Sequence, residues 1–168
     1  MGEENKKALE QQLWNIANEL RGKMDADEFR DYILGFIFYK YLSEKIENFT
    51  NELLKEDGIT FTSLDSNNPE HEEILNSLKD DCVQQLGYFL KPNELFSAMA
   101  KKGNSDNNNF ILDDLTQVLR HIESSTMGTE SEDDFEHLFE DLDLTSTKLG
   151  RTEEAKNKLI AKVLYHLD

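Results

Sequence analysis

Apolar residues recur at helical spacing along most of this chain, and glycine, proline or polar clusters separate the apolar runs. In the first run, Leu9, Leu13, Ile16, Ala17 and Leu20 fall on one face, which is typical of an amphipathic helix. The same spacing, with aspartate or proline at helix starts and glycine at helix ends, predicts six to seven helices. They fall at about residues 7–21, 27–55, 69–86, 92–102, 110–124, 135–140 and 152–167.

The stretch from Asp25 to Lys45 is the most apolar part of the chain. Acidic residues open it, and a nearly unbroken apolar and aromatic block follows from Tyr32 to Leu42. A helix over 27–55 would be roughly 40 Å long, and a helix that is apolar on every side has to be covered by other protein. We therefore expect its aromatic residues to be core and the helix to be the long centre of an irregular bundle. A platform on which nucleic-acid bases stack is the alternative interpretation.

No segment shows the strict alternation of a half-buried strand, and the nearest candidate, Ile59–Thr62, is short. We therefore expect one all-α domain over residues 1–168, without internal repeats. A chain of this length can bury a core large enough for it to fold without disulfide bonds or structural metal ions. Its single cysteine, Cys82, excludes an internal disulfide, which fits a reducing, intracellular setting.

Neither a secretory signal nor a membrane span is predicted. The first residues are polar, and the apolar core of a signal peptide does not follow them. The block from Tyr32 to Leu42 is about half as long as the ~20 residues that a span requires, and Lys40 interrupts it. We expect a cytoplasmic protein with no membrane contact.

The net charge of −17 is unevenly distributed. Residues 1–55 hold eight basic and eleven acidic side chains, a net of −3, whereas residues 56–144 hold five and twenty-one, a net of −16. Residues 145–168 hold five and three, a net of +2. Because affinity for duplex DNA comes largely from Lys and Arg on phosphates, a free domain of this charge should be repelled by nucleic acid on average. Any role on DNA would be local, or would belong to an assembly with basic partners.

No residue pattern predicts a catalytic, cofactor or metal site. The eight glycines are isolated from one another, so the sequence has neither a Gly-x-Gly pair nor a Walker loop for a phosphate. The cysteine and the four histidines lack metal-ligand spacing. The acidic pairs are interpreted as solvated helix faces, with a divalent-cation site as the alternative; they are Asp80-Asp81, Asp113-Asp114 and Glu140-Asp141. We therefore expect no catalytic, cofactor-binding or metal-binding residue in this chain.

Basic residues near the first two helices are the candidates for contact with DNA or a partner. They are Arg21, Lys23, Arg30 and Lys40. Acidic residues are interleaved with them, so the alternative is pairing with a nearby Glu or Asp along the helices.

Several segments, taken in order, resemble the N-terminal helical domain of the methylation (M) subunit of type I restriction–modification systems. The family has a Leu-Trp-x-x-Ala-x-x-Leu-Arg-Gly helix, which stands here as Leu13–Gly22. An acidic cap and an apolar helix follow in the family, and Ile37–Ser43 (IFYKYLS) matches that helix. Gly87–Phe96 and Phe135–Gly150 complete a resemblance that covers nearly the whole chain.

The resemblance implies a larger methyltransferase to which this chain contributes one part. The complete subunit would be an adenine-N6 DNA methyltransferase that uses S-adenosylmethionine. Two such subunits would join a specificity subunit that reads the DNA, and a restriction subunit can join them. The family's Gly-rich cofactor motif and Asn-Pro-Pro-aromatic loop are absent here, so we expect the catalytic domain to lie outside this chain and the fragment to be inactive by itself.

The role that this resemblance implies is to assist assembly and closure of the complex around DNA. The acidity of residues 56–144 makes the domain a poor direct DNA binder and favours protein contacts. An alternative from another class is a free-standing acidic interaction protein or DNA mimic, whose carboxylates would occupy a DNA-binding groove. A self-contained enzyme is a third possibility, for which no converging site is found.

Overall fold

A computed structural model describes residues 3–20, 26–103, 111–125 and 150–167. Within these ranges the chain forms six α-helices and three 3-10 turns, with no strand, and the all-α prediction is confirmed. The helices are α1 (Glu3–Leu20), α2 (Ala26–Leu54), α3 (Pro69–Leu86), α4 (Phe96–Gly103), α5 (Ile111–Ser125) and α7 (Glu153–Leu167). The turns are η1 (Lys55–Asp57), η2 (Phe61–Ser63) and η3 (Pro92–Glu94). The helix expected at 135–140 lies outside the described residues.

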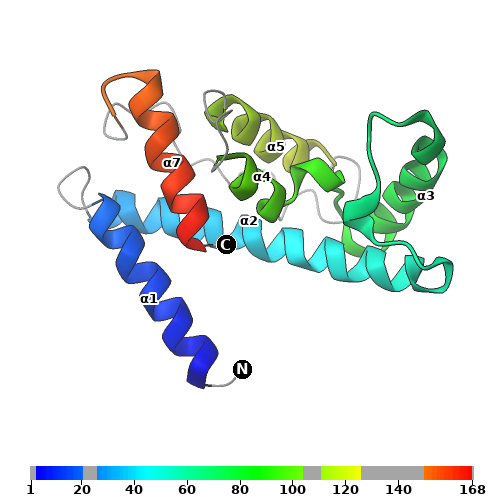
Figure 1. Cartoon of the computed structure of the whole chain (residues 1–168), viewed down its shortest axis with the longest axis horizontal. Helices are drawn as coiled ribbons and strands as arrows, with labels where there is room; N and C mark the ends of the chain where they lie inside the picture. Colours follow the sequence, from blue (N-terminus) through cyan, green and yellow to red (C-terminus); the bar gives the residue numbers. More distant parts are fainter. Residues whose placement is uncertain (1–2, 21–25, 104–110, 126–149, 168) are drawn as a thin grey trace.

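Helix α2 runs along the length of the molecule, and the other helices are arranged beside it (Figure 1). Helix α3 packs at one end of α2, α4 packs over its middle, and α7 contacts it near the other end. Helix α7 also packs on α1, α4 and α5, so it joins the N-terminal helix to the rest of the bundle.

One face of α2 supplies much of the core. Tyr32, Phe36, Tyr39, Leu42 and Ile46 are all buried, at the three- and four-residue spacing of a helix face. The Tyr39 ring meets the ring of Phe96 edge-on, with centroids 5.3 Å apart. Such aromatic pairs add to the stabilisation that comes from burial of the rings.

Three side-chain hydrogen bonds fasten the segment 88–96 to α2. The Tyr39 hydroxyl donates to the Glu94 carbonyl at 2.5 Å, and the Tyr88 hydroxyl donates to the Leu42 carbonyl at 2.8 Å. The backbone N–H of Phe96 donates to Oγ of the buried Ser43 at 2.9 Å. A buried backbone N–H without an acceptor costs free energy, and Ser43 supplies that acceptor inside the core.

The expectation that α2 is covered on every side is wrong within the described chain. Leu34, Phe38 and Tyr41 remain 57%, 37% and 54% exposed. These positions follow one another at i, i+4 and i+7, so they form a second apolar face that points away from the buried one. Not all of the aromatic block is therefore core.

The single helix expected at 92–102 is two elements. Pro92 opens the short η3 turn, and Leu95 is extended, with φ −65° and ψ 151°; α4 begins only at Phe96. The Glu94 side chain accepts the Lys91 N–H at 2.8 Å and closes the turn. Because Tyr39 and Ser43 hydrogen-bond the backbone on both sides of Leu95, tertiary contacts replace the helical bonds there.

Local signals account for the ends of α3. Asn68 caps its first turn by accepting the Glu70 N–H at 2.9 Å, and Pro69 occupies the first helical position. Gly87 ends the helix with φ 91°, a left-handed conformation that favours glycine. The segment 59–62, the nearest candidate for a strand, instead leads into the η2 turn.

Candidate interaction site

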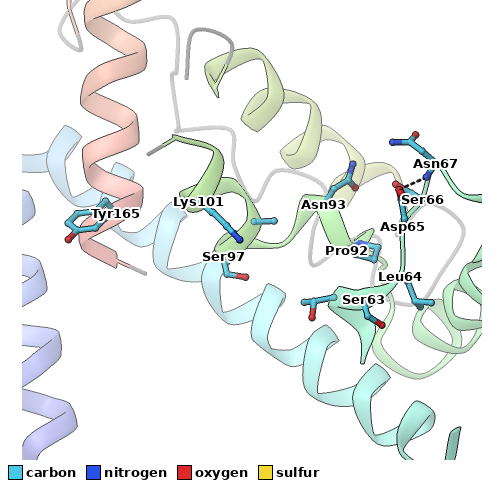
Figure 2. Close-up of a pocket in the computed structure, with 12 residues that line it drawn as sticks. Ser63, Leu64, Asp65, Ser66, Asn67, Pro92, Asn93, Ser97, Lys101 and Tyr165 are labelled. Atoms are coloured by element: carbon cyan, nitrogen blue, oxygen red, sulfur yellow. Dashed lines mark hydrogen bonds between the residues drawn. The ribbon is translucent and has the colours of Figure 1, made fainter. Parts of the chain in front are cut away.

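A groove lies between the connector that follows η2 and the η3–α4 segment (Figure 2). Its volume is about 970 Å³. Its lining includes the hydroxyl and amide side chains of Ser63, Ser66, Asn67, Asn93 and Ser97, although apolar atoms make up more of the lining surface. Lys101 of α4 and Tyr165 of α7 lie toward its other end. Such a lining can exchange hydrogen bonds with a polar partner.

Local hydrogen bonds shape the connector on one wall of this groove. The Asp65 carboxylate accepts the N–H of Asn67 at 2.9 Å, and the Asp65 N–H donates to Nδ1 of His71 at 2.9 Å. Oγ of Ser63 donates to the Thr60 carbonyl at 2.7 Å. These are the short-range bonds by which Asp and Ser favour turns, so the polar residues here order the loop as well as line the groove.

A second, apolar groove lies between α1 and α2. Leu13, Trp14 and Ala17 of α1 face Ile33 and Leu34 of α2 across a volume of about 450 Å³. Glu10 and Arg30 also line it, one from each helix. Trp14 is 62% exposed and Leu34 is 57% exposed. A groove of this lining suits a partner's apolar side chains better than a polar ligand.

The structure places two of the four basic residues predicted to contact DNA or a partner. Arg21 and Lys23 lie outside the described residues. Arg30 is exposed at the apolar groove. Lys40 donates to the backbone carbonyl of Leu167, and its Nζ is 4.0 Å from the Glu44 carboxylate. Lys40 thus joins α2 to the end of α7, and a contact role for these residues stays a prediction.

The titratable residues with shifted pKa values belong to the core. Burial is the main cause that raises the pKa of Tyr39, with a further contribution from Glu94. Burial likewise raises the pKa of Tyr88. Burial, reinforced by the charge of Asp81, raises the pKa of the Cys82 thiol to about 12. All three groups are held in their neutral forms at physiological pH, where they pack as part of the core.

One histidine forms a close pair with a carboxylate. Nδ1 of His121 on α5 lies 2.8 Å and 2.9 Å from the two carboxylate oxygens of Glu94. The pair is partly buried between η3 and α5 and helps to hold these elements together. In the part of the chain that the structure describes, no three His, Cys, Asp or Glu residues gather as they would around a metal ion.

Sequence reasoning misses the exposed apolar residues at the α1–α2 groove. The sequence pattern assigns Leu34 and Tyr41, with the rest of the block from Tyr32 to Leu42, to the core. The helical spacing of apolar residues along α2 is the signal that would identify its exposed ones. The residues at 34, 38 and 41 share one face, whereas those at 32, 36 and 39 share another.

Comparison with known proteins identifies the family. The sequence model of the HsdM N-terminal domain family matches residues 9–167. This chain belongs to the HsdM N-terminal domain family. The resemblance noted in the sequence to type I restriction–modification methylation subunits is therefore confirmed.

Two relatives of this HsdM N-terminal domain are much longer proteins. It is 30% identical over 171 residues to the type I restriction enzyme MpnII methylase subunit of Mycoplasma pneumoniae, in a match that covers 98% of this chain and 31% of that protein. It also resembles the crystal structure of a type I restriction-modification system methyltransferase subunit from Streptococcus thermophilus. That match has a TM-score of 0.75 and 36% identity, over 96% of this chain and 33% of the other. The chain thus spans about a third of each relative.

A membrane span requires a helix that is both long and apolar. None of the described helices meets both requirements.

Proposed function

We propose that this HsdM N-terminal domain is a non-catalytic part of a type I adenine-N6 DNA methyltransferase subunit, and that it helps the complex to assemble and close around DNA. The observation that carries the proposal is the family match over residues 9–167. Both relatives are named as methylation subunits of type I systems. The adenine-N6 reaction and the assembly role are the parts of the proposal that go beyond that observation.

The surface of the domain supports a role in contacts. It has an apolar groove between α1 and α2 and a second groove, with several hydroxyl and amide side chains in its lining, beside α4. The groups with strongly raised pKa values, by contrast, are buried in the core. An enzyme that flips a base out of a duplex has to hold the DNA while the base is unstacked, and a helical domain that contacts other subunits can close such a clamp without carrying positive charge.

The cofactor and partners follow from the same proposal. S-adenosylmethionine would serve the complete subunit and would be held outside the described residues, because neither groove is lined by glycine as a close approach of backbone to the cofactor requires. The partners would be a specificity subunit and a second methylation subunit, with a restriction subunit joining them. DNA would be bound through the whole complex, in the cytoplasm.

The test separates a helper domain from a catalytic one. The chain is added to the specificity subunit from the same genome and a methylation subunit that lacks the matching N-terminal third. Transfer of tritiated methyl groups from S-adenosylmethionine to a target duplex is then measured. We expect transfer to rise at least tenfold when the chain is added or fused back, because the complex can then close on DNA.

The control is calorimetry of the chain alone with S-adenosylmethionine, where we expect no binding up to about 100 µM of cofactor. The intact methylation subunit serves as the positive sample. Micromolar cofactor affinity in the isolated chain, or full methyl transfer without it, would overturn the proposed function.

A further inference from the structure

The groove beside α4 collects polar side chains that the domain does not use for its own hydrogen bonds. Ser66, Asn93, Ser97 and Tyr165 line it, and none of their side chains has a hydrogen-bond partner within the described residues. Unused bonding capacity is ordinary on an open surface, but here it is gathered around a hollow of about 970 Å³. That volume is at the upper end of the range for ligand pockets. The groove can therefore hold a partner and bond to it.

The groove is long, and one of its walls is ordered before anything binds. Figure 2 shows the lining residues in a row, from Tyr165 and Lys101 at one end to Asp65 and Asn67 at the other. The connector at the second end is held by its own hydrogen bonds, among them the bond from the Asp65 N–H to Nδ1 of His71. A row of groups suits an extended peptide better than a compact ligand, and a preformed wall lowers the cost of ordering on binding.

The lining combines apolar and polar groups as a bound peptide requires. Leu64 and Pro92 line the groove and are themselves buried, and Ala98 is half-buried, so they offer apolar contacts at its floor. The hydroxyl and amide side chains can both donate and accept hydrogen bonds. They can therefore satisfy the N–H and C=O groups of a peptide backbone when that backbone leaves water.

One cation without an ion-pair partner stands at the α7 end of the groove. Lys101 is exposed and unpaired within the described residues, whereas its neighbour Lys102 pairs with Asp114. The lining's other charged side chain is Asp65 at the connector end, whose carboxylate accepts the Asn67 N–H. The groove therefore has a positive end and a negative end. An acidic residue of a partner fits the positive end.

The elements around Lys101 are the least acidic part of the described chain. Residues 91–103, 111–125 and 150–167, which carry η3, α4, α5 and α7, hold eight basic and six acidic side chains, a net of +2. Residues 26–88, which carry α2 and α3, hold five basic and fourteen acidic side chains, a net of −9. Because salt screens charges that lie beyond about 10 Å at 0.1 M, the nearby charges decide what this end of the groove attracts.

We propose that this groove binds an extended acidic segment of a partner polypeptide in the methyltransferase complex. A carboxylate of that segment would pair with Lys101, and an adjacent side chain would pack on the ring of Tyr165. Its backbone would bond to the hydroxyl and amide side chains toward the connector. The inference deepens the assembly role proposed above and rests on it, because it names the surface used and the chemistry of the partner.

The same charges favour a peptide over a nucleic acid as the occupant. Duplex DNA carries one negative charge for about every 1.7 Å of its axis, so it would meet the acidic side chains of α2 and α3 as well as Lys101. One lysine lines the groove, and one phosphate contact contributes little affinity. A short peptide segment, by contrast, can place its few carboxylates at the positive end alone.

The first test is an NMR titration of the ¹⁵N-labelled chain with a synthetic nonapeptide of three Thr-Val-Glu repeats, which favours an extended chain. We expect the amide signals of Ser66, Ser97 and Lys101 to shift and to approach saturation by about 2 mM peptide. The same peptide with Lys in place of Glu should instead shift signals of the acidic helix α3. No shift in the groove, or equal shifts over the whole surface, would overturn the proposal.

Substitutions at matched positions test the site. Lys101→Glu and Lys79→Glu change the net charge equally, and both lysines are exposed, but Lys79 lies on α3 outside the groove. Lys101→Glu should weaken binding of the acidic peptide at least fivefold, and Lys79→Glu less than twofold. Ser97→Phe should block the groove with a similar loss, whereas Ser77→Phe at an exposed position of α3 should not. Circular dichroism verifies that each variant is folded. Equal effects within either pair would contradict the inference.

The second test identifies the occupant in the assembled complex. The photo-reactive residue p-benzoylphenylalanine replaces Ser97, and the chain is combined with the specificity subunit, the shortened methylation subunit and target DNA. We expect a cross-link to one protein segment in which acidic side chains outnumber basic ones. A cross-link to DNA would show that a nucleic acid occupies the groove. That result, a cross-link to a basic segment, or no cross-link at all would overturn the proposal.

The outcomes separate this inference from the proposed function. If Lys101→Glu and Ser97→Phe restore methyl transfer as well as the parent chain does, the groove is not used in assembly. The docking inference is then overturned and the assembly role stands. If the parent chain binds the acidic peptide in the groove but neither restores methyl transfer nor joins the complex, the assembly role is overturned instead.

Discussion

Cys82 shows how one buried residue can make stability depend on pH. Its side chain is fully buried on α3, and burial together with the charge of Asp81 raises the pKa of the thiol to about 12. In an unfolded chain the thiol ionises near pH 8.5. Between these values the unfolded state releases a proton that the folded state retains. The contribution is therefore fully present below about pH 8.5 and is lost as pH rises toward 12.

We expect Cys82→Ala to flatten the alkaline part of the stability curve. Each fully unmatched proton corresponds to about 1.4 kcal/mol per pH unit, so the difference in unfolding free energy between the two proteins should narrow by roughly 2 kcal/mol between pH 9 and 10.5. Urea unfolding at half-unit pH steps measures it. The buried Tyr39 and Tyr88 act in the same direction in both proteins and cancel in the difference. Parallel curves for the parent and the variant would contradict this account.

Buried polar residues tie the helices together at single points. The Asn157 side chain of α7 is 4% exposed, and its Oδ1 accepts the N–H of Leu112 at 2.9 Å in the first turn of α5. Its Nδ2 donates to the Glu153 carbonyl at 2.8 Å. The first N–H groups of a helix have no partner within it, and here a neighbouring helix supplies one. Within the described residues, every buried side-chain nitrogen and oxygen has a hydrogen-bond partner.

At the scale of elements, α4 and α7 approach each other closely at one glycine. A Cβ on Gly103 would lie 3.2 Å from Cβ and 3.3 Å from Cα of Ala161 on α7. We expect Gly103→Ala to push the two helices apart and to destabilise the chain by about 1–2 kcal/mol, even though alanine favours a helix more than glycine does. Urea unfolding provides the free energies.

Ala161→Gly provides the control for that crossing. It creates space opposite residue 103, so the double variant Gly103→Ala, Ala161→Gly should be more stable than the sum of the single changes predicts. A coupling free energy of about 1 kcal/mol or more is expected for residues in direct contact. Additive effects would show that contact with Ala161 is not the reason why Gly103→Ala loses stability.

The elements that can be predicted well are those specified by nearby residues. The range of α3 follows from Asn68, Pro69 and Gly87, which act within a turn of the helix ends. The break at Leu95 cannot be found this way, because Tyr39 and Ser43 produce it from more than fifty residues away. The exposure of Leu34 cannot be predicted from the sequence for a similar reason. Composition shows that α2 is apolar, but only packing shows which of its faces the other helices cover.

At the scale of the whole molecule, the acidic charge and the DNA-linked family have to be reconciled. The family places the chain among type I restriction–modification methylase subunits, yet its net charge is −17. In the described chain, acidic side chains stand exposed along α3, including Glu70, Glu73 and Asp80. A surface of this sign repels phosphates. A contribution to DNA binding is then expected through contacts with other subunits, and the domain by itself should be indifferent to DNA.

We expect the isolated chain not to bind a 30-base-pair duplex, with or without a type I target, up to about 100 µM in 150 mM salt. Fluorescence anisotropy of a labelled duplex measures it, and the assembled complex on the same duplex is the positive control. Binding through basic side chains would weaken steeply as salt rises, with a slope that counts the phosphates contacted. A micromolar affinity with such a slope would show that this domain holds DNA directly. A chain that instead displaces DNA from the complex would favour the acidic mimic, since its carboxylates would then compete with phosphates for the same cations.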